Sequence, residues 1–350
     1  MGDRGSQGDG CRSVENSGAG AFPGCPEFST DRHPSPFVIS VGNIAFGGRG
    51  KTPTVAAIAR LLLEMGERPA ILSRGYGRRH AAEGVVVVSD GRHILADLDR
   101  AGDEPLMLAR QLPGVAVLVC EQRAIAGAFA RHILGATSLV LDDGFQHRQM
   151  ARDVDVVLVT PADLQGRRAP LGRLRESVSA LDRADVIIGD GCRSVENSRS
   201  GGEFSTDRHP SPYFLHRQAG TPVSIETGVP ALAPGARVIA LAGIAGPARF
   251  TRAVEDAGYL VAGAWGPGDH YRYTRADLAR LAREVRAGGA VGVLTTSKDA
   301  ARLRTLRPLG VSVYEWPMHV AIEPAGVFTA WLAARLHSAR TRLNPPAVPA

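Results

Sequence analysis

The sequence predicts an α/β fold in which a doubly wound parallel sheet is followed by a second, smaller α/β domain. From about residue 37 onward, short runs rich in Val, Ile and Leu alternate with stretches of helical length. This alternation is typical of βαβ units, whose parallel strands are covered by helices on both faces. A glycine-rich loop follows the first of these runs directly, as is common where a strand leads into a helix in such folds.

The individual elements can be placed in order along the chain. In the first half we expect helices near 52–65, 103–111 and 123–134, between strands at 37–43, 69–73, 85–88, 115–120, 137–143, 154–160 and 185–188. In the second half, further helices up to about residue 338 alternate with the apolar runs 237–243, 259–265, 291–296 and 311–316. The chain therefore contains two successive α/β units.

A polar repeat separates these units and also occupies the start of the chain. GDGCRSVENS occurs at 8–17 and 189–198, and EFSTDRHPSP occurs at 27–36 and 203–212. Its polar composition predicts loops in both places. A duplicated recognition peptide is one interpretation, and an insertion or assembly artefact without function is the favoured one. We thus expect a disordered segment 1–36, a first domain 37–188, a dispensable inserted loop 189–212, a second domain 213–338 and a tail 339–350.

Composition narrows the class of protein. The chain has 350 residues, 44% of them hydrophobic and 22% charged, which is ordinary for a globular protein. No run approaches the roughly 20 apolar residues that span a bilayer, and no signal-peptide pattern is present, so we expect a cytoplasmic location. The net charge of +6 favours anionic partners such as phosphates or an acidic membrane surface, while only 5% aromatic residues argue against nucleic acid.

Lysine usage singles out two positions. Of the 41 Lys and Arg residues only Lys51 and Lys298 are lysine. In a chain so biased toward arginine, a retained lysine indicates a site where a compact ammonium cannot be replaced by a planar guanidinium. Chance retention is the alternative for each.

Lys51 lies in the strongest motif, SVGNIAFGGRGKTP at 40–53. An apolar strand runs into a glycine-rich loop that opens a helix, which is the arrangement of a phosphate-binding P-loop. Lys51 would reach the β- and γ-phosphates of ATP, and Thr52 would ligate Mg²⁺. The alternative is a glycine-rich turn without function. The predicted nucleotide-binding residues are Ala45, Phe46, Gly47, Gly48, Arg49, Gly50, Lys51 and Thr52.

A second motif, TSLVLDDGFQHR at 137–148, is an apolar strand that ends in two carboxylates. Parallel strands gather their carboxyl ends at one edge of a sheet, so Asp142 and Asp143 are expected to face Lys51 and to hold Mg²⁺. A polar turn after a strand is the alternative. With the P-loop, this motif predicts a P-loop-type fold with ATP and Mg²⁺ as cofactors.

Further motifs follow in a characteristic order. They are SRGYGR at 73–78, GDEP at 102–105, LGRLRE at 171–176, LAGIAGPARF at 241–250, GDHY at 268–271 and TTSKDAARL at 295–303. Together with the P-loop and LDDGFQHR, this series resembles that of the tetraacyldisaccharide 4′-kinase family, over roughly residues 37–335. The resemblance implies transfer of the ATP γ-phosphate to the 4′-hydroxyl of a tetraacyldisaccharide 1-phosphate, a lipid A precursor, at the cytoplasmic face of the inner membrane.

The resemblance also implies roles for particular residues. Asp103 would be the carboxylate that accepts the sugar hydroxyl proton, with His270 as its partner; taken alone, Asp103 is an N-cap candidate and His270 an exposed loop residue. Residues lining the site for nucleotide, metal or substrate phosphate would be Tyr76, Glu104, Arg123, Gln146, His147, Arg175 and Glu176. A surface ion pair is the alternative for Arg175 and Glu176.

Some features depart from the family pattern or have no assigned role. Arg49 stands where a small hydroxyl residue is expected, and Ser297 where glutamate is more usual. Residues 1–36 contain no amphipathic helix of the kind that touches a membrane. Lys298 and Asp299 match the family without a role. Two rival functions are a P-loop ATPase that acts as a switch and a catalytically degenerate nucleotide-binding protein.

Overall fold

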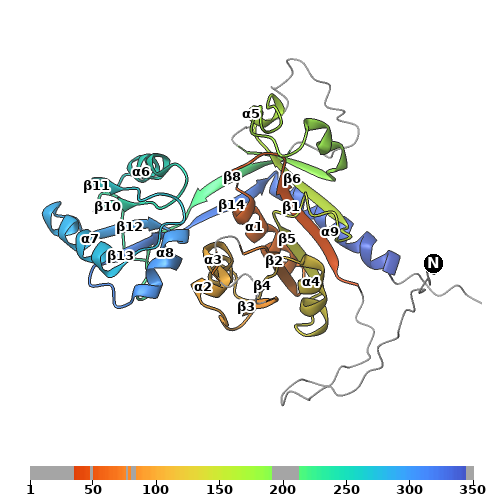
Figure 1. The fold of residues 1–350 in the computed structure, drawn as a ribbon, viewed down its shortest axis with the longest axis horizontal. Helices are drawn as coiled ribbons and strands as arrows, with labels where there is room; N and C mark the ends of the chain where they lie inside the picture. Colours follow the sequence, from red (N-terminus) through yellow and green to blue (C-terminus); the bar gives the residue numbers. More distant parts are fainter. Residues whose placement is uncertain (1–34, 48–49, 76–77, 80–83, 191–212, 344–350) are drawn as a thin grey trace, which may run out of the picture. The chain divides into compact units, whose positions relative to one another are not determined.

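The computed structural model describes residues 35–47, 50–75, 78–79, 84–190 and 213–343, and these residues form two β-sheets with their helices (Figure 1). The larger sheet has nine strands in the order β14-β8-β7-β6-β1-β5-β2-β4-β3. The smaller has five, in the order β11-β10-β12-β13-β9. The predicted α/β class is confirmed.

The larger sheet is parallel except at its two edges, where β3 runs antiparallel to β4 and β14 antiparallel to β8. An antiparallel edge strand is common on doubly wound sheets. The strands of the larger sheet are β1 Phe37–Asn43, β2 Pro69–Ser73, β3 Val86–Asp90, β4 Ala116–Val119, β5 Ser138–Asp142, β6 Val154–Val159, β7 Val186–Gly189, β8 Tyr213–Ala219 and β14 Met318–Glu323.

The smaller sheet is parallel apart from β9, which pairs antiparallel with β13. Its strands are β9 Val223–Ser224, β10 Arg237–Leu241, β11 Leu260–Trp265, β12 Gly292–Thr296 and β13 Val313–Trp316. The helices are α1 Lys51–Glu64, α2 Leu98–Ala101, α3 Asp103–Gln111, α4 Arg123–His132, α5 Pro161–Leu164, η1 Val178–Arg183, α6 Pro247–Asp256, α7 Arg275–Ala287, α8 Ser297–Leu303, η3 Arg304–Leu306 and α9 Ala325–Leu343.

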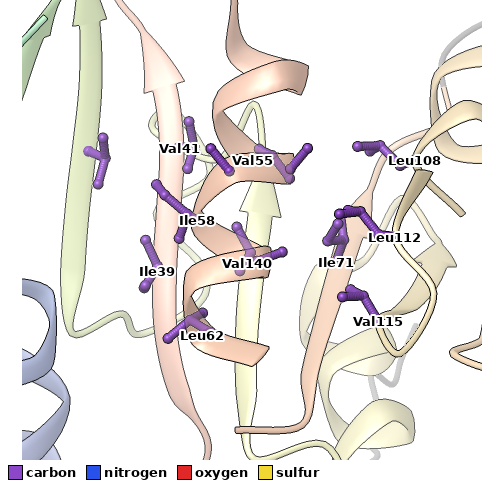
Figure 2. Packing of buried hydrophobic residues seen from close by; sticks show 14 of the residues in the cluster. Ile39, Val41, Val55, Ile58, Leu62, Ile71, Leu108, Leu112, Val115 and Val140 are labelled. Atoms are coloured by element: carbon purple, nitrogen blue, oxygen red, sulfur yellow. The ribbon is translucent and has the colours of Figure 1, made fainter. Parts of the chain in front are cut away.

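Both faces of the larger sheet are covered, because alternate residues of β1 enter different cores. Ile39 belongs to the core that includes α1, whereas Val38 belongs to the core that includes α4. Figure 2 shows Ile58 and Leu62 of α1 in the same packed layer as Ile39 and Val140 of β5. Burial of each such side chain contributes roughly 1.5–3 kcal/mol, so this layer fixes the start of α1 beside the end of β1.

The second α/β unit begins later than the expected residue 213. Strand β8 pairs with β7, β14 pairs with β8, and Phe328 of α9 lies in the core of the larger sheet. We therefore call the nine-stranded sheet with α1–α5, η1 and α9 the first lobe, and residues 223–316 the second lobe. The chain leaves the first lobe after β8 and returns to it in β14. These two strands form an antiparallel pair, although the whole second lobe lies between them in sequence.

The expected tail at 339–350 also begins too early. Helix α9 continues to Leu343, and Arg340 near its end donates to the Thr137 carbonyl at 2.8 Å and pairs with Glu67 at 2.7 Å. These contacts hold the last turns against the first lobe. The segment 1–34, the repeat at 191–212 and residues 344–350 lie outside the described residues.

The expected start of the inserted loop, residue 189, is too early in the sequence. Gly189 belongs to β7, and Asp190 pairs with Arg217 of β8 at 2.5 Å. In the parallel pair of β7 and β8, Ile188 lies directly beside Tyr213. The two strand ends are thus separated by about one strand spacing, roughly 4.8 Å. Because the strands are parallel, the connection must turn back along β7 before it enters β8, which takes about a dozen residues.

We expect that deletion of residues 197–206 leaves the fold intact, because it still leaves a connection of about a dozen residues between the parallel strands β7 and β8. Loop-closure entropy changes by only about 0.6 kcal/mol for each halving of loop length, so the melting temperature should stay within about 5 °C of wild type. Asp190→Ala is the matched comparison and should lower the melting temperature, because it removes the partner of Arg217 from a buried position. An unfolded product from the 197–206 deletion would contradict this assignment.

Candidate active site

The glycine-rich loop runs from the end of β1 to the first residue of α1. Gly50 precedes α1 with a φ of 72°, and a β-carbon there would lie 3.1 Å from Leu215 Cδ1, so glycine is favoured on both counts. Lys51 Nζ donates to Asn43 Oδ1 at 3.2 Å and to the Gly47 carbonyl at 3.4 Å. The ammonium therefore lies over the loop, where a phosphate bound by the loop would meet it.

The first part of the loop is fastened to the segment that follows α5. Ala45 is buried, and the Phe46 N–H donates to the Arg173 carbonyl at 2.8 Å. The Phe46 side chain is 51% exposed, with the Arg175 guanidinium 5.3 Å from its ring centroid. Two arginines thus lie beside the loop without belonging to it.

The carboxyl end of β5 brings acidic side chains to this loop, as predicted. Asp143 Oδ1 lies 3.4 Å from Lys51 Nζ, and Thr52 Oγ1 donates to Glu104 Oε2 at 3.1 Å. Burial, followed by the nearby carboxylates of Glu104 and Asp143, raises the pKa of Asp142 to about 7. Burial is the first cause of this shift, and Lys51 and Arg123 oppose it, so a further cation would stabilise the ionised form of Asp142.

Asp103 opens α3 and is the meeting point of the two lobes. Its side chain is 6% exposed, and its Oδ1 accepts from the Glu104 N–H at 2.9 Å. From the second lobe, His270 Nδ1 lies 3.1 Å from Asp103 Oδ2, Arg302 Nε donates to it at 3.0 Å, and Lys298 Nζ is 3.9 Å away. Burial alone would raise the pKa of Asp103, but Lys298, Arg302 and His270 outweigh it and hold that pKa below its ordinary value.

Three further predicted residues surround the acidic cluster. Arg123 is buried and donates to the Asp142 carbonyl at 3.4 Å, and Gln146 Nε2 donates to the Asn43 carbonyl at 2.9 Å. Burial, aided by Arg123 and other arginines, lowers the pKa of His147. His147 is therefore suited to hydrogen bonding as a neutral imidazole rather than to holding charge.

Arg175 and Glu176 point to different partners. Arg175 donates to Asp143 Oδ2 at 2.9 Å and to Gln146 Oε1 at 3.4 Å, so it joins the acidic cluster. Glu176 pairs with Arg183 at 2.9 Å and with Arg148 at 3.3 Å. The surface ion pair expected as the alternative thus exists for Glu176, but with these arginines rather than with Arg175.

Three predicted site residues, Gly48, Arg49 and Tyr76, lie outside the described residues. Two residues at the site have contacts that the sequence did not suggest. Asn43 holds Lys51, and its only sequence signal is a polar residue at the end of an apolar strand. Arg302 contacts Asp103, and its signal is the four-residue spacing from Lys298, which puts both cations on one face of α8.

Two kinds of feature, a ready-made metal cluster and a membrane-spanning helix, are not found within the described ranges. There, no group of three or more His, Cys, Asp or Glu side chains is arranged to hold a metal ion by itself. None of the helices in those ranges is long and apolar enough to cross a bilayer.

Comparison with known proteins agrees with this geometry. The family model described as tetraacyldisaccharide-1-P 4′-kinase matches residues 26–337. The tetraacyldisaccharide 4′-kinase of Anaeromyxobacter sp. (strain Fw109-5) is 42% identical over 291 residues, covering 77% of this chain and 74% of the relative. That of Syntrophus aciditrophicus (strain SB) is 37% identical over 310 residues, covering 83% and 82%.

A solved structure is similar as well. The "apo" form of LpxK from Aquifex aeolicus in complex with ATP has a TM-score of 0.69 and 28% identity, covering 86% of this chain and 89% of that chain. The match spans both lobes, which a stand-alone nucleotide switch would not require. The chain therefore belongs to the tetraacyldisaccharide-1-phosphate 4′-kinase family and is an ATP-dependent kinase of lipid A biosynthesis.

Proposed function

We propose that phosphoryl transfer occurs between the glycine-rich loop and Asp103, with the sugar 4′-hydroxyl bound beside Asp103 and His270. The observation that carries this proposal is a continuous line of contacts between the two places. Lys298 Nζ lies 3.9 Å from Asp103 and 3.0 Å from Glu104, and Glu104 accepts from Thr52 at the start of α1. An acceptor hydroxyl near Asp103 would then be within reach of a γ-phosphate over Lys51.

The nucleotide would be held by the loop of residues 45–52. Backbone N–H groups and the amino end of α1 suit phosphate oxygens, as the similar structure in complex with ATP also supports. Lys51 would exchange its Asn43 and Gly47 acceptors for β- and γ-phosphate oxygens. We assign Arg175, which lies beside Phe46 and Asp143, to charge that develops on the transferring phosphoryl group.

The donor set of the acidic cluster fits Mg²⁺. Asp142 and Asp143 supply carboxylate oxygens, Thr52 supplies a hydroxyl, and a cation beside Asp142 would offset the burial and the neighbouring carboxylates that raise its pKa. Because Mg²⁺ commonly takes one or two carboxylates together with substrate phosphates, the lack of a larger acidic group among the described residues is compatible with this metal. When bound, the ion would neutralise charge on the β- and γ-phosphates.

Asp103 and His270 would act as one proton-accepting unit. As the 4′-hydroxyl oxygen attacks the γ-phosphorus, its proton would pass to Asp103 Oδ2, 3.1 Å from His270 Nδ1. His270 comes from the second lobe, so the unit exists only while the two lobes are in contact. The remaining predicted contacts to substrate and nucleotide are Tyr76, Glu104, Arg123, Gln146, His147 and Glu176.

We also propose that the enzyme acts at the cytoplasmic face of the inner membrane, because the acyl chains of the substrate belong in a bilayer. The net charge of +6 would attract anionic headgroups. Beside the glycine-rich loop, Leu171 is 82% exposed and is flanked by the exposed Arg168 and Arg173. This apolar and basic segment suits contact with a lipid surface.

We predict that Lys51→Ala lowers kcat by at least about 10²-fold, because it removes a cation from the transferring phosphoryl group. Lys51→Arg should fail as well, since the fork is too large for a position with 12% exposure and three oxygen neighbours within 3.4 Å. Circular dichroism should show both variants folded. A fully active Lys51→Arg enzyme would refute the assigned role of the ammonium.

Asp103→Asn and His270→Gln should each lower kcat by about 10² to 10⁴. If the two residues act as one unit, the double variant should be little worse than the poorer single variant, because such effects are non-additive. The KM for ATP should barely change. Losses that multiply in the double variant would count against a shared proton path.

Asp142→Asn should raise the Mg²⁺ concentration that gives half-maximal kcat by about tenfold, the loss typical when a metal site is perturbed. The comparison variant is Asp256→Asn, an exposed carboxylate at the end of α6 in the second lobe, which should behave as wild type. Titration of kcat with Mg²⁺ at fixed ATP measures both. An unchanged Mg²⁺ dependence in Asp142→Asn would remove this residue from the metal site.

A further inference from the structure

Helix α8 presents a buried arginine to the amino end of α3. Arg302 is 4% exposed, and Asp299, one turn earlier on α8, is fully buried. Both belong to the motif TTSKDAARL at 295–303. A buried cation that contacts a residue of the other lobe requires a reason beyond packing, since burying charge is costly unless it is paired.

The second lobe fixes the position of this guanidinium from behind. Arg302 Nη1 donates to Asp299 Oδ1 at 3.0 Å and to the Gly243 carbonyl at 2.9 Å. Asp299 is itself held, because Tyr273 donates to its Oδ1 at 2.8 Å and Thr296 Oγ1 to its Oδ2 at 2.7 Å. All of these groups come from the second lobe, so Arg302 has one orientation before it meets Asp103.

The Nε and Nη2 atoms of the same guanidinium contact Asp103. Nε donates to Asp103 Oδ2 at 3.0 Å, and Nη2 also contacts that oxygen. His270 Nδ1 approaches the same oxygen at 3.1 Å, while Oδ1 is occupied by the N–H of Glu104. The two donors of Arg302 on Oδ2 and the N–H of Glu104 on Oδ1 therefore fix the orientation of the carboxylate, with Oδ2 facing His270.

The charges that face Asp103 come from three elements. Glu104 adjoins it on α3, Lys298 and Arg302 face it from α8, and His270 faces it from the turn 268–271. Asp269 of that turn lies 3.4 Å from Lys298 and so offsets part of that lysine's charge. Arg302 is the most buried of these cations, and the lowered pKa of Asp103 agrees with its influence.

We propose that Arg302 is a positioning residue for phosphoryl transfer, which keeps Asp103 ionised and oriented to accept the hydroxyl proton. The 4′-hydroxyl loses its proton as its oxygen bonds to the γ-phosphorus and the bond to the ADP oxygen breaks. The proton passes to the Asp103 carboxylate, which becomes a neutral carboxyl, while His270, whose Nδ1–H donates to the ionised Oδ2, holds that carboxylate in place. This inference rests on the proposed roles of Asp103 and His270.

The test compares the pH dependence of kcat in wild type, Arg302→Gln, Arg302→Lys and Arg304→Gln. Arg304 is the matched control, because it forms an ion pair with Glu315 at 2.9 Å within the second lobe and does not contact Asp103. Saturating ATP, Mg²⁺ and tetraacyldisaccharide 1-phosphate are used throughout. The melting temperature and the KM for ATP of each variant are measured alongside.

Arg302→Gln should lower kcat at neutral pH by at least about tenfold. It should also move the acidic limb of the profile to higher pH, because a carboxyl that loses a neighbouring cation binds its proton more tightly. Arg302→Lys keeps the positive charge but not the planar guanidinium. The acidic limb of its pH profile should therefore move less than that of Arg302→Gln, while its kcat stays below wild type. Arg304→Gln should leave both limb and kcat near wild type, and no variant should change the KM for ATP.

A folded Arg302→Gln enzyme whose acidic limb is unmoved, or whose kcat matches that of Arg304→Gln, would overturn the proposal. If Arg302→Gln does not fold, the test rests on Arg302→Lys. A wild-type kcat together with a wild-type pH dependence of kcat in Arg302→Lys would then overturn the proposal. Failure of the underlying function is distinguishable, because Asp103→Asn would then remain active. Failure of this inference alone leaves Asp103→Asn inactive while the Arg302 variants behave as wild type.

Discussion

The ion pair between Asp103 and Arg302 joins the two lobes at the point where the chemistry is proposed. A carboxylate with 6% exposure stays ionised only with compensating charge, and the groups that lower the pKa of Asp103, which are Lys298, Arg302 and His270, come from the second lobe. The same contacts bring His270 and Lys298 to the amino end of α3. Contact between the lobes and the charge state of Asp103 therefore depend on each other.

The opposite balance holds at the carboxyl end of β5. There burial, followed by the carboxylates of Glu104 and Asp143, outweighs Lys51 and Arg123 and raises the pKa of Asp142 to about 7. Asp103 and Asp142 are thus both buried, yet their pKa values shift in opposite directions, because the cations beside Asp103 outweigh its burial and those beside Asp142 do not. In the proposed function, this difference separates a site for an added cation from a site that accepts a proton.

Much of the fold followed from local pattern, and the exceptions have a common cause. The alternation of apolar runs and helices predicted the parallel sheets, and α1 begins at Lys51, one residue from the expected position. Strands β8 and β14 were not predicted, and their residues were assigned to the second domain, because their pairing joins segments on either side of a whole lobe. Lys51, Asp142 and Asp143 were predictable from strand-end motifs. Arg302 was not, since it meets Asp103 across 199 positions of sequence.

The central claim is that this site moves phosphate to a lipid hydroxyl rather than to water. The most direct measurement is ADP formation by the purified protein with γ-labelled ATP and Mg²⁺, with and without tetraacyldisaccharide 1-phosphate in mixed micelles. We expect ADP formation to depend on the lipid, with one label on the lipid for each ADP formed. Equal ADP formation without the lipid, with the label released as inorganic phosphate, would contradict it.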